Sequence, residues 1–149
     1  MKGFDLSSSL GYYFSKSNNL FKSSFNRLLM KKGYRLNSDH WTVLIILKNN
    51  PGIRQTDIAV IMQRDQPAVT RMMDFLENEG IVSRKNDPRD RRAHNIFLTE
   101  DGEQMYVELL GVAEELNNKL LEGIDKKNVK LLRKTLSLLI ERMMKTEPA

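Results

Sequence analysis

The chain of 149 residues contains no cysteine, which excludes disulfide bonds, thiolate metal sites and thiol-based redox sensing. Histidine is scarce too: His40 and His94 are the only two, so we expect no metal site. Long apolar runs are missing, since the longest, Val43 to Leu47, is far too short to cross a membrane. No continuous apolar segment follows the first five residues, so we expect no secretory signal and a cytoplasmic location.

Signs of an enzyme are also lacking. The sequence has no glycine loop of the kind that cradles phosphates, and no nucleophile with a recognisable base partner. Asp87 and Asp90 lie among arginines, which favour the charged carboxylate and suit these residues poorly to acid catalysis. We therefore expect no enzyme activity and no cofactor.

Positive charge is present and unevenly distributed. The net charge is +5, which favours an anionic partner without choosing one. Residues 1–36 hold seven basic residues and one acidic residue, and residues 84–92 hold five basic and two acidic. Residues 93–149 balance at −2, which predicts no attraction of this part to phosphate. Hydrophobic residues make up 40% of the chain, enough for a folded core.

Apolar residues recur at helical spacing in six segments. The first helix is expected within 8–32, before Gly33, and the second begins after the cap Asn37 and ends at Asn50-Pro51-Gly52. Short helices are expected over 55–62 and from the cap Asp65 to Gly80. Thr99 can cap a long fifth helix that Gly123 interrupts, and a sixth runs from about Lys126 to Met144, followed by a frayed tail over 145–149.

Two short β-prone segments, 81–85 and 94–98, flank the loop Asn86-Asp87-Pro88-Arg89-Asp90-Arg91-Arg92. Such a pattern predicts a β-hairpin. Its loop carries three arginines and is too polar to be buried. Because it directly follows two short helices joined by a turn, the layout is that of a winged helix, a mainly α fold with a small β-hairpin that binds DNA.

Several stretches carry a family resemblance that covers nearly the whole chain. Glu77 to Arg84, Asp87 to Ala93 and Leu98-Thr99-Glu100-Asp101-Gly102 together resemble the multiple antibiotic resistance regulator (MarR) family. Leu36 to Trp41 looks like the family's second-helix entry, 55–59 like its third helix and 68–73 like its recognition helix. Two features depart from the family pattern: Arg54 replaces a Ser or Thr cap and adds a cation, and Asp65-Gln66-Pro67 replaces a Ser or Thr pair.

The resemblance implies a winged helix-turn-helix head over 37–99, with dimerisation segments at 1–36 and 100–149. A two-fold dimer places its recognition helices about 34 Å apart on a pseudo-palindromic operator. The implied function is a sequence-specific regulator of double-stranded DNA, a repressor relieved by a small-molecule ligand. Candidate ligand-binding residues are Tyr12, Phe21, His40 and Trp41.

The residues themselves suit DNA recognition. Gln66 can pair bidentately with adenine, Arg71 with guanine or a phosphate, and Pro67 or Ala68 can pack on a thymine methyl group. Arg89 or Arg91 can enter a narrow minor groove, with Asp90 directing Arg92. The candidate DNA-binding residues are Gln55, Thr56, Gln66, Pro67, Ala68, Thr70, Arg71, Arg84, Arg89, Asp90, Arg91 and Arg92.

Two other functions remain open from the sequence. A helical adaptor would bind another protein through residues 100–144 and ignore duplex DNA at moderate salt. A sequence-neutral DNA-binding protein would use charge alone and bind all duplexes equally.

Overall fold

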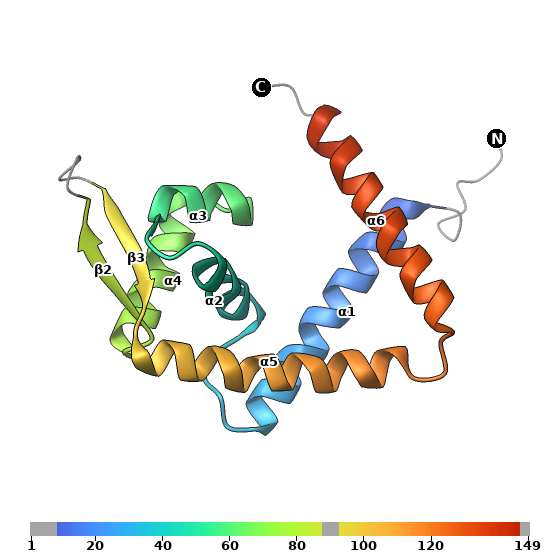
Figure 1. Cartoon of the computed structure of the whole chain (residues 1–149), viewed down its shortest axis with the longest axis horizontal. Coiled ribbons are helices and arrows are strands. Elements are labelled where there is room, and N and C mark those ends of the chain that lie inside the picture. Colours follow the sequence, from blue (N-terminus) through green and yellow to red (C-terminus); the bar gives the residue numbers. More distant parts are fainter. Residues whose placement is uncertain (1–8, 88–92, 147–149) are drawn as a thin grey trace. The chain divides into compact units, whose positions relative to one another are not determined.

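The computed structural model describes residues 9–87 and 93–146. About seven-tenths of the structure is helical, and a small sheet makes up part of the rest (Figure 1). The elements are α1 Leu10–Lys31, α2 Ser38–Asn49, β1 Ile53–Arg54, α3 Gln55–Met62, α4 Gln66–Asn78, β2 Val82–Asn86, β3 His94–Leu98, α5 Glu100–Leu121 and α6 Lys126–Thr146. This order is that of a winged helix-turn-helix with long flanking helices, as the sequence predicts. Within the described ranges no helix is long and apolar enough to cross a membrane.

Three helices begin at the capping residues expected from sequence. The Asn37 side chain accepts hydrogen bonds from the backbone N–H groups of Asp39 and His40, at 2.9 and 3.0 Å. The Asp65 carboxylate accepts the N–H of Ala68 at 2.7 Å. These bonds satisfy donors that a helix start otherwise leaves unpaired, and so fix where α2 and α4 begin.

Thr99 caps α5 and also ties that helix to the head. Its hydroxyl accepts the N–H of Gly102 at 3.0 Å and donates to the carbonyl of Gly80 at 2.5 Å. Gly102 is required here because a Cβ atom would lie 2.0 Å from the carbonyl oxygen of Ile81. The Leu-Thr-x-x-Gly motif therefore joins the start of α5 to the turn between α4 and β2.

The sheet has one more strand than the predicted hairpin. β1 pairs with β3, and β3 pairs with β2, all antiparallel in the order β1-β3-β2. The β2–β3 register runs from Val82 opposite Leu98 to Asn86 opposite His94. Since β1 is only two residues long, no alternation of apolar and polar residues marks it in the sequence.

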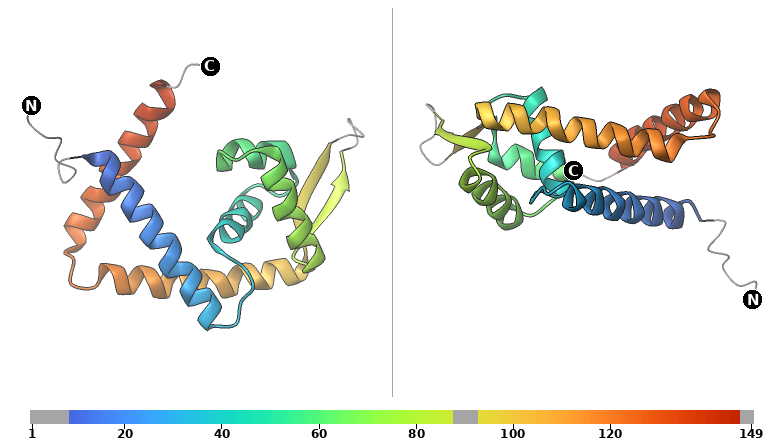
Figure 2. Two further views of the ribbon diagram at one scale, coloured as in Figure 1. Left: turned by 180° about the vertical axis from the view of Figure 1, so that it is seen from behind. Right: turned by 90° about the horizontal axis from the view of Figure 1, so that it is seen from below.

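The core of the head lies between α2, α3, α4 and the sheet. Figure 2 shows α4 running beside the β2–β3 hairpin. The apolar side chains Val69, Met73 and Leu76 of α4 are fully buried. The fully buried large side chains of this core are Val43, Leu44, Leu47, Ile58, Val69, Met73, Leu76 and Ile96. Burying this surface provides the main stabilisation of the head.

The chain divides into two compact units, residues 1–113 and 114–149. In the second unit Gly123 adopts a left-handed conformation at the turn before α6 (φ +76°). Helix α6 continues to Thr146, so the tail predicted to fray from Lys145 is helical for two residues more than expected.

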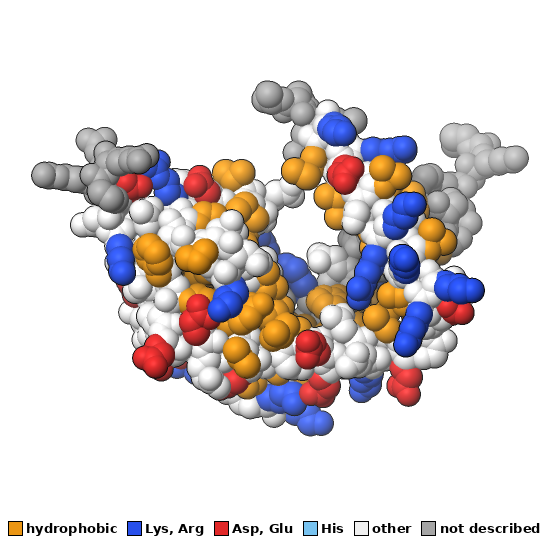
Figure 3. Space-filling view, in the orientation of Figure 1, with side chains coloured by type: hydrophobic (Ala, Val, Ile, Leu, Met, Phe, Trp, Pro, Cys, Tyr) orange, Lys and Arg blue, Asp and Glu red, His pale blue; other side chains and the backbone are white. Residues whose placement is uncertain are grey.

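Charge in the C-terminal part is separated by helix. Helix α5 carries six acidic residues and one basic residue, whereas α6 carries seven basic residues and one acidic. Lys and Arg side chains gather over α6 in Figure 3. The sequence-level balance of −2 for residues 93–149 therefore averages over two helices of opposite charge.

Candidate DNA-binding surface

The first turn of α4 is the exposed end of a well-anchored helix. Val69, Met73 and Leu76 are fully buried on its inner side. Gln66, Pro67 and Arg71 are exposed on its outer side, Thr70 is exposed with its hydroxyl bonded to Gln55, and Ala68 is half-buried. Pro67 lies at the first turn, where its missing N–H costs no hydrogen bond. The helix therefore presents its N-terminal side chains outward from a fixed base.

A hollow of about 200 Å³ lies beside the starts of α3 and α4. Its lining residues are Arg54, Gln55, Thr56, Gln66, Ala93 and His94. Helix α3 begins without a side-chain cap because Arg54 stands at the capping position, as the sequence predicts. Gln55 and Thr56, expected near a phosphate, are both part of this lining.

Arg54 has a role that sequence reasoning missed. Its Nε and Nη2 atoms donate to Oδ2 of Asp87, at 3.0 and 2.8 Å. Asp87 is only 8% exposed, and its N–H donates to the carbonyl of Ala93 at 3.0 Å. The sequence suggests that Arg54 adds a cation to the DNA-binding surface. In the structure this side chain instead holds the base of the β2–β3 loop through Asp87.

Three of the predicted DNA contacts bond to one another. The Gln55 amide donates to the Thr70 hydroxyl at 2.9 Å and accepts from Nε of Arg84 at 3.3 Å. Arg84 also pairs with Asp74 at 2.6 Å and with Glu77 at 2.7 Å. The remaining predicted contacts, Arg89, Asp90, Arg91 and Arg92, lie outside the described residues.

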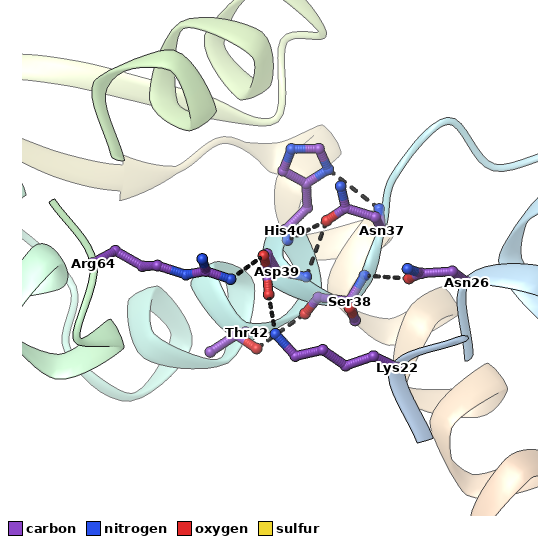
Figure 4. Close-up of polar contacts among 8 residues, drawn as sticks. All are labelled: Lys22, Asn26, Asn37, Ser38, Asp39, His40, Thr42 and Arg64. Carbon is purple, nitrogen blue, oxygen red and sulfur yellow. Dashed lines mark hydrogen bonds and ion pairs between the residues drawn. The ribbon is translucent and has the colours of Figure 1, made fainter. Parts of the chain in front are cut away.

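A polar network joins α1, the start of α2 and the turn before α4 (Figure 4). The Asp39 carboxylate accepts from Lys22 of α1 at 2.6 Å and from Arg64 of the turn at 2.9 Å. Asn26 of α1 accepts the N–H of Ser38 at 2.7 Å. Burial alone would raise the pKa of Asp39, but the hydrogen bond and charge of Lys22 and the charge of Arg64 outweigh it and lower that pKa.

His40 closes the cap of α2 from the other side. Its Nδ1 accepts the N–H of Asn37 at 3.2 Å, which completes a reciprocal capping box. The ring stacks on Phe75 of α4, with centroids 4.7 Å apart. Burial lowers the pKa of His40, because a charged imidazolium loses solvation there, and the nearby charge of Asp39 opposes this only in part.

The four candidate ligand-binding residues do not share one contact cluster. Trp41 lies 6.4 Å from Phe25 and 5.3 Å from Tyr106, centroid to centroid. Phe21 stacks on Phe25 and so belongs to the same aromatic chain. His40 instead contacts Phe75, and Tyr12 contacts Lys16 and Tyr13 near the start of α1.

Comparison with known proteins places this geometry in a family. A family model, described as the MarR family, matches residues 36–94. The transcriptional repressor CouR, solved bound to a 23-mer DNA duplex, is 28% identical, with a TM-score of 0.83 over 94% of this chain and 98% of that one.

Two further structures agree. CouR from Rhodococcus jostii RHA1 bound to p-coumaroyl-CoA is 27% identical, with a TM-score of 0.76 over 92% of this chain and 95% of that one. A MarR-family transcriptional regulator from Rhodococcus sp. RHA1 is 26% identical, with a TM-score of 0.83 over 92% of this chain and 96% of that one. Residues 36–94 therefore form a domain of the MarR family, and the whole chain has the fold of MarR-family transcriptional regulators.

Proposed function

We propose that this chain is a homodimeric repressor that binds a specific double-stranded DNA operator and is released from it by a small molecule. The observation that carries the proposal is the first turn of α4, which exposes Gln66, Pro67 and Arg71 from a helix whose opposite side is buried. Only the N-terminal side chains of a recognition helix reach base edges in the major groove. The similarity to CouR, whose structure contains a DNA duplex, supports this assignment.

Each residue of this turn has a distinct contribution to base reading. The Gln66 amide matches the donor–acceptor pair of adenine, and the Arg71 guanidinium matches guanine or a phosphate. Pro67 and Ala68 offer apolar surface to a thymine methyl group. Asp65 is anionic and caps α4, so it stays out of contact with phosphate.

Backbone contacts come from the neighbouring hollow and from the loop between β2 and β3. Gln55 and Thr56 line the hollow at the start of α3, where backbone N–H groups and a hydroxyl favour a phosphate. The loop contributes Arg89 or Arg91 to an adjacent minor groove, whose negative potential attracts arginine. Arg54 and Asp87 support that loop at its base.

A second copy of the chain is the partner that best fits the long helices. Residues 1–36 and 100–149 form the dimerisation segments in this proposal, and residues 37–99 the head. Many large apolar side chains of the two dimerisation segments are exposed: Leu10, Tyr13, Phe14, Leu20, Phe21, Val107, Leu110, Leu120, Ile124, Leu131, Leu132, Leu138, Ile140, Met143 and Met144. Apolar surface of this extent marks an interface.

Relief by a small molecule is the regulatory part of the proposal. A ligand shifts binding only if it prefers one of two conformations of the dimer. The aromatic chain that joins Phe21 and Trp41 through Phe25 supplies two of the candidate contacts. The other two candidates, Tyr12 and His40, lie outside this chain. CouR, solved with p-coumaroyl-CoA, supports an acyl or aromatic ligand class.

Selection of bound sequences from a pool of random duplexes tests the DNA-binding function. We expect a pseudo-palindromic sequence to be enriched, and to bind roughly 10³-fold or more tightly than unrelated DNA. A pool that stays random after selection would contradict sequence-specific binding and favour either charge-only binding or an adaptor. Light scattering that returned the monomer mass of 17.3 kDa at micromolar concentration would contradict the dimer.

A further inference from the structure

We propose that Arg84 is a positioning residue of the DNA-binding surface, which fixes α4 against α3 and β2 and does not itself contact DNA. The proposal rests on the proposed function, because it concerns the orientation of the helix that reads the operator. It also reassigns a residue that the sequence places among the DNA contacts.

All three guanidinium nitrogens of Arg84 have acceptors within the protein. Nη1 pairs with Glu77 at 2.7 Å, and Nη2 pairs with Asp74 at 2.6 Å. Nε donates to the Gln55 amide oxygen at 3.3 Å, and Nη2 also lies 3.5 Å from the Thr70 carbonyl oxygen. The planar fork of arginine suits this arrangement, since its donors point in fixed and different directions.

Arg84 itself lies on β2, and its acceptors come from two other elements, α3 and α4. Thr70, Asp74 and Glu77 lie on one side of α4, about one, two and three turns beyond Gln66. Gln55 is the first residue of α3, and its own amide N–H₂ donates to the Thr70 hydroxyl at 2.9 Å. Arg84 and Gln55 together therefore fix the rotation of α4 about its axis relative to α3.

Local charge and burial argue against a phosphate contact at Arg84. Two carboxylates face one guanidinium, so the cluster carries a net charge of −1 and repels a phosphate. The Arg84 side chain is only 18% exposed, whereas Asp74 and Glu77 are 52% and 40% exposed. A phosphate approaching this site would therefore meet the carboxylates before it reached the cation.

The consequence for function is that Arg84 affects specificity through Gln66 and Arg71. Those two side chains extend from the same helix that Arg84 orients, and base recognition depends on bidentate geometry. A small rotation of α4 weakens contacts with the correct base pairs more than contacts with phosphates. Loss of the clamp should therefore reduce discrimination between operator and unrelated DNA and leave the number of phosphate contacts unchanged.

The variant Arg84→Lys tests this role, because it keeps the positive charge and loses the fork. The duplex selected from a random pool and a scrambled duplex are titrated with wild type and variant at several salt concentrations. We expect roughly tenfold loss of discrimination in the variant, on the scale of coupling within such networks, with an unchanged salt slope. A variant that discriminates like wild type, or an Arg84→Gln variant whose salt slope falls by about one, would overturn the proposal.

Glu77→Gln is the matched control, because the two roles predict opposite effects. If Arg84 positions α4, loss of this negative charge weakens the bond to Arg84 and with it operator discrimination; if Arg84 binds phosphate, loss of a competing negative charge strengthens binding to every duplex. Hydrogen exchange of α4 amides gives a readout without DNA: faster exchange in Arg84→Lys is expected, and unchanged exchange would contradict the clamp. Failure of the proposed function gives a different result from failure of the Arg84 proposal. If the proposed function is wrong, the wild type itself binds the selected and the scrambled duplex equally.

Discussion

Gly102 has the least room for a side chain of all the glycines that the structure describes. A Cβ atom there would lie 2.0 Å from the backbone carbonyl oxygen of Ile81, which no side-chain movement relieves. We expect Gly102→Ala to lower the free energy of unfolding by about 1–3 kcal/mol, as overpacking does. Urea denaturation measures this change.

Gly111, in the same helix, is the matched control. A Cβ atom at Gly111 meets nothing within 4 Å. Alanine there should raise stability by about 0.5–1 kcal/mol, because it restricts the unfolded chain within a helix interior. If both substitutions stabilised the protein equally, that result would contradict the close approach of α5 to the turn between α4 and β2.

At the scale of single residues, the sequence predicts local contacts and misses distant ones. Asn37, Asp65 and Thr99 are recognisable as caps because their partners lie two or three residues away. Arg54 and Arg84 look like surface cations in the sequence. Their partners, Asp87 and Asp74, are 33 and 10 residues away along the chain, and only the fold brings them together.

At the scale of elements, the start of α2 predicts a dependence of stability on pH. Burial lowers the pKa of His40 from its ordinary value of 6.5, so the folded state keeps the neutral ring to lower pH than the unfolded chain does. The unfolded chain binds a proton more readily as the pH falls below 6.5. The neutral His40 ring therefore contributes its full share to the free energy of unfolding above pH 6.5. This contribution is lost as the pH falls towards the lower pKa of the folded state.

Thermal unfolding of the variant His40→Gln between pH 7.5 and pH 5.5 checks this dependence. Glutamine retains a capping-box acceptor and cannot titrate, so we expect a smaller loss of melting temperature on acidification than in wild type. His94 is exposed, and His94→Gln should behave like wild type. If His94→Gln removed the pH dependence and His40→Gln did not, the assignment to α2 would fail.

Asp39 is the residue through which α1 and the turn before α4 are joined. Its carboxylate pairs with Lys22 and Arg64 and is 28% exposed. Asp39→Asn should lower the free energy of unfolding by about 1 kcal/mol, the upper range for partly exposed ion pairs. Glu103→Gln, which removes the more exposed pair with Lys48, should change it by much less, and an equal loss would contradict a special role for Asp39.

Most elements could be predicted from their apolar periodicity and breakers. The helix 55–62 and the strand 94–98 match the sequence analysis residue for residue. Strand β1 could not be foreseen, because two residues carry no period and its pairing with β3 is a long-range contact. The helical continuation of α6 to Thr146 also exceeds the expected end.

At the scale of the whole molecule, the sequence identifies the family but not the surfaces used. Winged-helix order, arginine-rich loop and Leu-Thr-x-x-Gly motif together suffice for the MarR family, which the match over residues 36–94 confirms. The apolar stripes of α1, α5 and α6 indicate a partner, yet no pattern in one chain specifies which stripe meets which in a second copy. Summed charge was equally uninformative for residues 93–149, where acidic α5 and basic α6 cancel.

The central claim is that the first turn of α4 reads base pairs, and Gln66 tests it most directly. Titration of wild type and Gln66→Ala against the selected duplex, and against duplexes with single base pairs replaced, measures where the side chain acts. We predict a loss of about 1–3 kcal/mol on the selected duplex and almost none on duplexes that already lack the base pair that Gln66 contacts. An equal loss on every duplex, or no loss on any, would contradict base reading by α4.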